Sequence, residues 1–550
     1  MKRLTDRPNL DHLRKQAKDL LARYRSGDAA ALARIRDGLP AAVGKDDAAV
    51  RKLGLRLHDA QSCVAREYGF PSWTDLKIYV EARVARASGR VPSPLDWLRL
   101  VYAGDLAGGT SRARPRVAAM VLDEAPGFVG DDPYLACAAG DIAVLRRATE
   151  DDPQWVNRSG GALDLPPLVA VTHSSLARLP AFRERLHACA RLLLDAGAHP
   201  NQSAGSRSPP ASLSQPAEEV RLSALYGAAG QNHDGELTDL LLTAGANPND
   251  GESLYHALES LDCTRRLLAA GARIAGSNAV YRILDLDSID GLRLLLSYGA
   301  NPNEPAPGAP TAHSGSPLLW AIRRRRSPAH IAALLAAGAD PAARTRDGTS
   351  AHTLALRLGL PDVAELLPSD AGGPISDTEQ FITACARGDR ARARRLLARR
   401  GGLMAEFTAS QLRVLPELAA LGCGEPVRLM VELGWPIATT GGDWNASALN
   451  HAVFRGDAAL TRFLLEHGAS WRERHGFGDN ACGTLSWASC NEPVDGGDWL
   501  GCAEALVAHG MPMAQPDPAG GADVVIEGYR KRFSDEVTDF LLRGPASGRV

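Results

Sequence analysis

One short phrase recurs through this sequence: two or three apolar residues, two further residues, then glycine and alanine. Its copies place the glycine at Gly197, Gly245, Gly271, Gly299, Gly338 and Gly468. The leucines put an apolar stripe on a helix, and glycine ends a helix in the left-handed conformation at little steric cost. The steps are uneven, for example 28 residues from Gly271 to Gly299 and 39 from Gly299 to Gly338. Such repetition is typical of stacked helical repeats that have gained and lost loop residues, and each repeat buries its apolar face only against its neighbours. Because only 5% of the residues are aromatic, small aliphatic side chains must fill these interfaces.

The turns and helix starts around this phrase also recur. In three copies the turn closes with proline and asparagine, at 199–201, 247–249 and 301–303, and serine-led helix starts stand at 223–228, 316–321 and 447–452. At these residues the chain resembles the ankyrin-repeat family, whose first helix opens Thr-Pro-Leu-His-x-Ala in a repeat of about 33 residues. Tyr226, Leu319 and Asn450 depart from that pattern where the family favours His. The resemblance implies an all-α ankyrin-repeat solenoid of about ten or eleven degenerate helix pairs.

The spacing of the repeats predicts two arrays. A similar opening phrase occurs at 136–141 and 384–389, and 347–367 has the pattern of a closing repeat. We therefore predict a first array over 131–367, a linker over 368–376 that is rich in Gly, Pro and Ser, and a second array over 377–515. A connecting segment at 91–130 and a C-terminal helical cap and tail at 516–550 complete the division. We expect the Pro- and Ser-rich insert at 203–216 to be a disordered loop.

The first 90 residues predict a separate basic helical domain. They contain 19 Lys and Arg against 11 Asp and Glu, whereas the whole chain has a net charge of −2. We predict three helices in this domain. The first begins at Leu10 and is capped by Asn9, the second runs from about 50 to 68, and the third begins at Ser72 and continues toward 80. The phrases at 13–21 and 65–73 resemble the small helical domain that precedes ankyrin arrays in many bacterial proteins, a resemblance that implies no particular activity.

Motifs of the common enzyme classes are absent from the sequence. It has no P-loop, no dinucleotide-binding Gly-x-Gly-x-x-Gly, no nucleophile elbow and no His-Glu-x-x-His. His467, His475, Cys482 and Cys490 are possible zinc ligands, but they lie seven or eight residues apart, whereas zinc ligands usually come in closer pairs. A helix-terminal histidine, favourable to the helix dipole, and buried thiols explain these residues better than a metal site does. We therefore predict no enzyme activity, no metal and no cofactor.

Candidate partner-binding residues follow from the ankyrin resemblance, which implies a concave groove and exposed turns. They are Arg323, Arg324, Phe454 and Arg455 in the groove and Arg344, Arg346 and Trp471 on turns. The run Arg323 to Arg326 has two interpretations: an interface for an acidic partner, or a solvated loop without function. Trp471 also has two interpretations: its ring binds a partner, or it covers the apolar edge of its own repeat.

These observations favour a scaffold that binds a protein partner of unknown identity. The alternative is a nucleic-acid-binding adaptor that uses the basic domain 1–90, although no basic stripe with interleaved aromatics stands out there. No apolar stretch approaches the ~18 residues of a membrane span, and the start of the chain has no apolar leader. We expect a cytoplasmic, monomeric protein.

Overall fold

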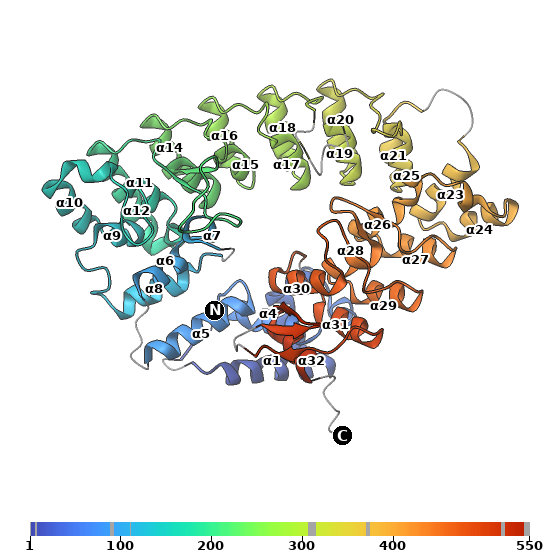
Figure 1. Ribbon diagram of the computed structural model, residues 1–550, viewed down its shortest axis with the longest axis horizontal. Helices are drawn as coiled ribbons and strands as arrows, with labels where there is room; N and C mark the ends of the chain where they lie inside the picture. The colour runs from blue at the N-terminus through green and yellow to red at the C-terminus, as the bar shows by residue number, and fades with distance from the viewer. Residues whose placement is uncertain are drawn as a thin grey trace. The chain divides into compact units, whose positions relative to one another are not determined.

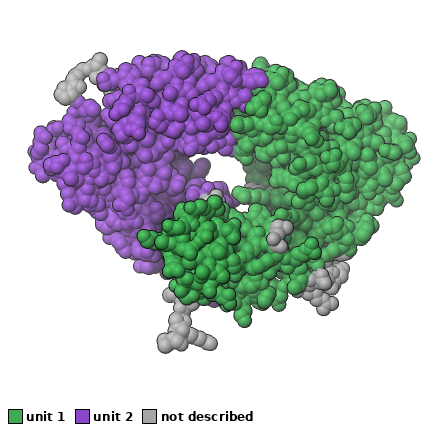
Figure 2. All heavy atoms as spheres, turned by 180° about the vertical axis from the view of Figure 1, so that it is seen from behind, with its two compact units in different colours: residues 1–279 green, residues 280–550 purple. Residues whose placement is uncertain are grey.

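The computed structural model describes residues 2–5, 8–87, 93–109, 112–305, 308, 315–369, 375–494, 496–518 and 523–543. The chain is predominantly helical, as predicted (Figure 1). It divides into two compact units, Met1–Ala279 and Val280–Val550 (Figure 2). This division falls inside the predicted first array rather than at the predicted linker, of which 370–374 lie outside the described residues. No described helix is long and apolar enough to cross a membrane.

Unit 1 opens with a helical domain that has its own core. Its elements are α1 (Leu10–Arg25), α2 (Ala29–Gly38), η1 (Pro40–Ala42), α3 (Asp47–Arg51), α4 (Leu57–Glu67) and α5 (Trp73–Ala87). The Asn9 side chain caps α1 by accepting from the backbone N–H groups of Asp11 and His12, as the sequence predicted. The predicted helix over 50–68 is instead two helices, because Gly54 between them has a φ of +63°. The helix α2 was not predicted.

Helices α6 (Pro94–Val101), α7 (Gly104–Ala107) and α8 (Pro115–Glu124) join this domain to the first helix pairs. The Arg114 guanidinium forms an ion pair with Asp75 of α5, and that of Arg116 lies 5.2 Å from the centroid of the Phe70 ring. The connecting segment predicted at 91–130 is therefore helical where described, and it packs on the N-terminal domain.

Helix pairs then follow one another in both units. In unit 1 they are α9 (Pro133–Ala139) with α10 (Ile142–Asp151), α11 (Pro167–Thr172) with α12 (Pro180–Asp195), α13 (Ala224–Tyr226) and the π-helical η4 (Gly227–Gln231) with α14 (Gly235–Thr243), and α15 (Ser253–Ala257) with α16 (Leu261–Ala269). Short 3-10 turns lie at η2 (Pro153–Asn157) and η3 (Ser175–Arg178). Neighbouring first helices pack on one another, as α9 does on α11, and so do neighbouring second helices, as α10 does on α12.

Unit 2 continues the same arrangement. Its pairs are α17 (Ala279–Asp285) with α18 (Ile289–Ser297), α19 (Pro317–Arg323) with α20 (Pro328–Ala336), α21 (Ala351–Arg357) with α22 (Pro361–Ala364), α23 (Asp377–Ala386) with α24 (Arg390–Arg399), α26 (Val414–Ala420) with α27 (Gly424–Glu432), α28 (Ala448–Phe454) with α29 (Ala458–Glu466), and α30 (Ala481–Asn491) with α31 (Trp499–Ala508). The short η6 (Leu403–Glu406) and α25 (Ala409–Leu412) precede α26. All six predicted helix-ending glycines have φ between +82° and +96°, which confirms their role.

Asparagine side chains tie one turn to the next. Asn249 donates its Nδ2 to the carbonyl of Gly271 at 3.2 Å and accepts the N–H of Arg273 at Oδ1, at 2.8 Å. The same two bonds join Asn157 to Gly197 and His199, Asn201 to Gly245 and Asn247, and Asn303 to Gly338 and Asp340. Each bridge satisfies a carbonyl and an N–H at the end of the following helix pair.

The insert at 203–216 is ordered, contrary to the prediction. Strand β1 (Ser203–Gly205) pairs antiparallel with β2 (Arg221–Ser223). Arg207, in the loop that connects these strands, is 4% exposed and donates to the carbonyls of Leu106 and Leu163 at 2.6 Å each. A buried arginine with two backbone acceptors holds this loop in place.

The C-terminal segment contains strands as well as the predicted helix. Strands β5 (Gln515–Pro516), β6 (Val524–Ile526) and β7 (Tyr529–Lys531) form an antiparallel sheet before α32 (Asp535–Arg543), which packs on α31. The described residues of 516–550 are thus a small mixed cap rather than a purely helical one. Strands β3 (Thr440–Gly441) and β4 (Ala446–Ser447) form a further short hairpin.

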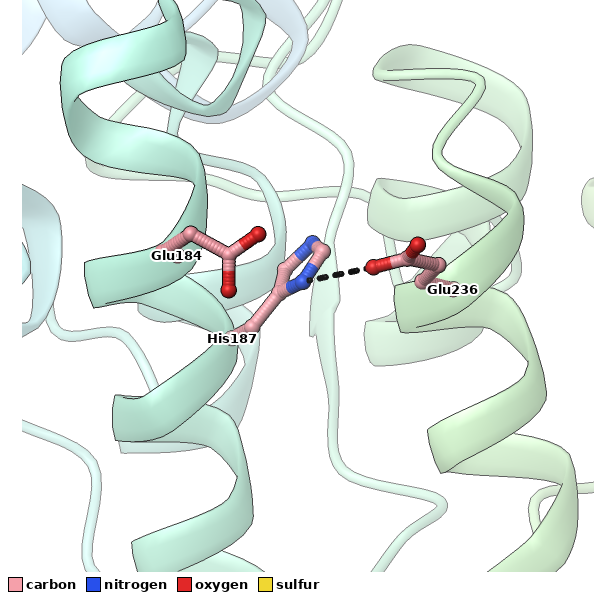
Figure 3. Close-up of side chains that lie close together, drawn as sticks. All are labelled: Glu184, His187 and Glu236. Atoms are coloured by element: carbon pink, nitrogen blue, oxygen red, sulfur yellow. Dashed lines mark ion pairs between the residues drawn. The ribbon is translucent and has the colours of Figure 1, made fainter.

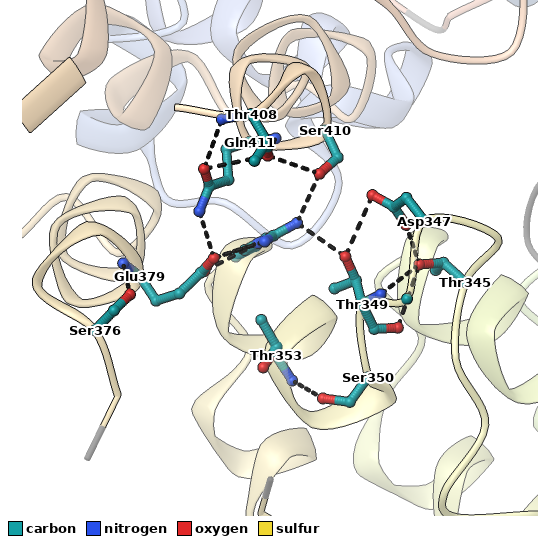
Figure 4. A network of polar contacts seen from close by, with 12 residues as sticks. Thr345, Asp347, Thr349, Ser350, Thr353, Ser376, Glu379, Thr408, Ser410 and Gln411 are labelled. Atoms are coloured by element: carbon teal, nitrogen blue, oxygen red, sulfur yellow. Dashed lines mark hydrogen bonds and ion pairs between the residues drawn. The ribbon is translucent and has the colours of Figure 1, made fainter. Parts of the chain in front are cut away.

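A buried ion pair joins the two predicted arrays across the predicted linker. Arg357, at the end of α21, makes a bidentate contact with Glu379 of α23, with Nη2 to Oε1 at 2.6 Å and Nε to Oε2 at 2.9 Å. Glu379 also accepts from Gln411 Nε2 at 2.7 Å, and Arg357 Nη1 donates to the Thr349 hydroxyl at 3.1 Å. Figure 4 shows Glu379, Gln411 and Thr349 converging from three segments of unit 2. Helix α21 packs directly on α23, so the helix pairs continue through this region.

Candidate functional site

The predicted arginine run lies at the end of α19, and Arg324 is its centre. Its Nε contacts Asp285 Oδ1 of α17 at 2.7 Å, and its Nη2 contacts Asp443 Oδ2 in the β3–β4 hairpin at 2.6 Å. The guanidinium also lies 4.0 Å from the centroid of the buried Trp320 ring, whose Nε1 donates to Asp285. One arginine therefore joins α17, α19 and a hairpin more than a hundred residues further along the chain.

The other three arginines are bonded within unit 2 as well. Arg323 Nη2 contacts Glu417 Oε1 of α26 at 2.8 Å, and Arg326 Nη1 contacts Asp287 at 2.7 Å. Arg325 donates to the carbonyl of Leu358. Burial raises the pKa of the Glu417 carboxyl, although the charge of Arg323 opposes that shift. Each arginine of the run therefore has a partner within unit 2, and the binding of an acidic partner by Arg323 and Arg324 stays a prediction.

Aromatic rings continue from Asp443 along the first helices. The ring of Trp444 lies 4.8 Å from that of His451 and 5.6 Å from that of Phe454, centroid to centroid. Phe454 stacks on Trp487 of α30, with centroids 5.5 Å apart and planes inclined by 8°. Trp444 also contacts His475, which contacts Phe477. We call Trp444, Phe454, His475, Phe477 and Trp487 the aromatic surface.

Two rings of the aromatic surface are open to solvent on an ordered support. Phe477 is 82% exposed and Trp487 is 52% exposed. The loop that carries Phe477 is held by backbone bonds, from Gly476 N–H to the Trp444 carbonyl at 2.9 Å and from His475 N–H to the Asp479 carbonyl at 3.0 Å. Large exposed aromatic rings on a rigid support are typical of protein interfaces.

The remaining predicted residues lie in different settings. Arg455 packs beside this surface over Gly422 and donates Nη1 to the Ala420 carbonyl at 3.2 Å. Arg344 and Arg346 are exposed on the turn between α20 and α21. Trp471 is only 5% exposed, with the Arg472 guanidinium 4.3 Å from the ring centroid. The predicted exposed Trp471 is therefore corrected: its ring is buried and lies near Gly510, which follows α31.

The four possible zinc ligands serve separate local roles. The His467 ring bonds the Phe463 carbonyl at 2.8 Å, near the end of α29. The backbone N–H of Phe477 donates to His475 Nδ1 at 3.3 Å. Cys482 is buried, and the Cys490 thiol points to the carbonyl of Arg532. Burial raises the pKa of the Cys482 thiol to about 11, so that it stays protonated at neutral pH.

A pocket of about 510 Å³ lies where turns of successive helix pairs meet. It is lined by Arg325, Arg387, Cys423 and Glu425, among others. Burial raises the pKa of the Cys423 thiol, so the thiolate that nucleophilic chemistry requires is not favoured. Nothing in this lining pairs a nucleophile with a base.

Sequence reasoning missed Trp444, Phe477 and Trp487. Phe477 stands between two glycines, a pattern that signals an exposed ring on a tight loop. The stacking of Phe454 on Trp487 joins consecutive first helices, and no local pattern encodes it.

No protein-family model matches the chain, and no curated protein matches it. A solved structure, the crystal structure of the human ASB11 ankyrin repeat domain, is similar at 20% sequence identity. The match covers 44% of this chain and 99% of that one, with a TM-score of 0.32.

Proposed function

We propose that this chain is a non-enzymatic scaffold that binds a protein partner on the aromatic surface. The observation that carries the proposal is the pair of open rings, Phe477 and Trp487, joined into one row through the rings of His475, Trp444 and Phe454. Burying such rings on binding supplies hydrophobic free energy with little loss of side-chain entropy, because their support is already rigid.

The surface favours a partner segment that presents apolar side chains flanked by acidic ones. Arg455 borders Phe454, and Arg474 is exposed two residues before Gly476. These cations complement carboxylates at the rim, where charge influences the rate and specificity of association. Arg323 and Arg324 act as positioning residues here, because Arg324 holds the hairpin that carries Trp444. A role for Arg344 and Arg346 stays a prediction.

Replacing Phe477 and Trp487 by Ala in the full-length chain tests the proposal. Truncation of a central interface aromatic commonly costs 2 kcal/mol or more, so we expect capture of specific proteins from cell extract to fall by roughly 30-fold. The matched control is Tyr298→Ala, an aromatic 44% exposed at the end of α18. Capture should also weaken as salt rises.

Equal capture by the double variant and the wild type would overturn the proposal. The alternative of a nucleic-acid adaptor would be favoured if the chain instead retained RNA or DNA. That retention should be lost when the exposed Lys15 and Lys18 of α1 are replaced by Glu. Reversal of Arg324 to Glu should lower both capture and melting temperature, because its ion pairs are partly buried. Cytoplasmic location and a monomeric state stay predictions.

A further inference from the structure

Three potential metal ligands meet between two second helices of unit 1, away from the aromatic surface. Glu184 and His187 lie one turn apart on α12, and Glu236 lies in the first turn of α14. One ligand atom from each lies within 4.8 Å of the others. Figure 3 shows Glu184 on one side of the imidazole and Glu236 on the other.

The imidazole of His187 is held in a fixed orientation. Its Nε2 lies 2.7 Å from Asp234 Oδ2, and its side chain is only 8% exposed. Asp234 is itself fixed as the N-cap of α14, where Oδ1 accepts the backbone N–H of Leu237 at 3.0 Å. When Nε2 carries the hydrogen donated to Asp234, Nδ1 is left with a lone pair, and this atom lies 3.5 Å from Glu236 Oε2. A carboxylate that orients a histidine in this way is a recurrent feature of protein metal sites.

We propose that Glu184, His187 and Glu236 bind a zinc ion that joins α12 to α14, with water completing the coordination. Bonds of 2.0–2.1 Å in a tetrahedral arrangement separate ligand atoms by about 3.3 Å, close to the distance between His187 Nδ1 and Glu236 Oε2. Both glutamates are exposed, so their side chains have room to rotate toward the ion. Two carboxylates also balance the charge of a divalent ion.

The chemistry of the ligand set selects the class of metal. An imidazole nitrogen with two carboxylates suits zinc and neighbouring transition metals, whereas Mg²⁺ and Ca²⁺ favour sites made only of oxygen. Arg183 is a cation close to the site, with its Nε 3.9 Å from Asp234 Oδ2 and donating to the carbonyl of Ala177 at 3.3 Å.

The competing state is a metal-free salt bridge. The hydrogen bond to Asp234 raises the pKa of His187, and a doubly protonated imidazole could contact Asp234 and Glu236 at once. Because that proton occupies Nδ1, zinc and hydrogen ions compete for the same nitrogen. The two states therefore differ in a measurable way.

The test is a titration of the full-length chain with Co²⁺, followed by visible d–d absorption and then by displacement with Zn²⁺. We expect one tight site without thiolate charge-transfer bands, and no displacement by excess Mg²⁺. Glu236→Gln and Glu184→Gln should each weaken binding at least about 10-fold, and Asp234→Asn by roughly 10- to 100-fold. Both glutamates are exposed, so these variants should fold; Glu150→Gln, an exposed glutamate on α10, is the matched control.

Equal Co²⁺ affinity in the wild type and in a Glu184→Gln, Glu236→Gln double variant would overturn the proposal, and so would the absence of a tight site. Either result assigns His187 to a salt bridge alone. Neither bears on the aromatic surface, which is tested separately.

Discussion

Breaking the bidentate pair between Arg357 and Glu379 should strongly destabilise unit 2, and Glu379→Gln tests this. The side chains are 10% and 16% exposed, and the pair joins the last helices of the predicted first array to the opening helix of the second. Glutamine keeps the shape of the side chain but removes the charge. The guanidinium of Arg357 would then remain largely buried without its counter-ion.

The burial of Arg357 determines how much Glu379→Gln should destabilise unit 2. Removing one partner of a buried ion pair costs about 3–5 kcal/mol, because an uncompensated charge stays in a poorly solvated site. In a unit of this size each kcal/mol lowers the melting temperature by roughly 2–4 °C, so the transition of unit 2 should fall by roughly 6–20 °C. Gln411, which donates to Glu379, would also lose a charged acceptor.

Thermal melting and amide hydrogen exchange measure the effect. Exchange should rise together in α21 and α23, because each packs on the other. Arg357→Met with Glu379→Met should recover most of the loss, since no buried charge remains. The exposed pair of Arg390 and Glu432 is the matched control, and Glu432→Gln should change melting little. If Glu379→Gln melts like that control, or if α21 and α23 exchange independently, the arrays are separate as the sequence suggested.

Three further outcomes follow from the structure. Asn249→Ala removes two hydrogen bonds to the next turn and should destabilise unit 1 by about 1–3 kcal/mol, measured by urea unfolding. Leu295 is fully buried, so Leu295→Ala should lower the free energy of unfolding by ~2–5 kcal/mol and raise hydrogen exchange on both sides of 368–376. A rise confined to residues before 368 would contradict the continuity of unit 2. Burial lowers the pKa of His173 and of His451 to about 4, so both imidazoles are neutral in the folded protein at neutral pH. As pH falls from about 6.5 toward 4, the unfolded chain binds protons that the folded chain does not, and the free energy of unfolding should decrease. This decrease should be smaller in His451→Gln than in the wild type, as measured by acid unfolding.

Local features of the fold could be predicted from the sequence because short segments encode them. The left-handed glycines at helix ends depend on a residue without a side chain, and the Asn9 cap depends on one side chain and two adjacent N–H groups. The helical class follows from the same repeated signals. The repeat count, the solenoid and the domain boundaries need contacts between repeats, which the periodicity of one repeat does not specify.

Features that depend on distant residues could not be predicted. Arg323 and Arg324 have the composition of an open basic patch, yet their partners Glu417 and Asp443 lie about a hundred residues away in the chain. Arg207 belongs to a segment with the composition of a disordered loop, and its acceptors come from two other parts of unit 1. Pro- and Ser-rich composition describes what a segment does alone, whereas contacts with distant residues, such as those of Arg207, hold this segment in place.

These distant contacts also affect the proposed function. Arg324 contacts Asp285 and Asp443 at the same time, so the first helix pair of unit 2 helps to determine where the β3–β4 hairpin lies. Trp444 follows Asp443 directly, and its ring contacts both Phe454 and His475. The aromatic surface therefore depends on residues that a partner need not touch. A substitution at Asp285 should weaken partner binding by releasing Arg324. It should also raise hydrogen exchange in the β3–β4 hairpin before any partner is added, whereas a substitution of a residue that only contacts the partner should not.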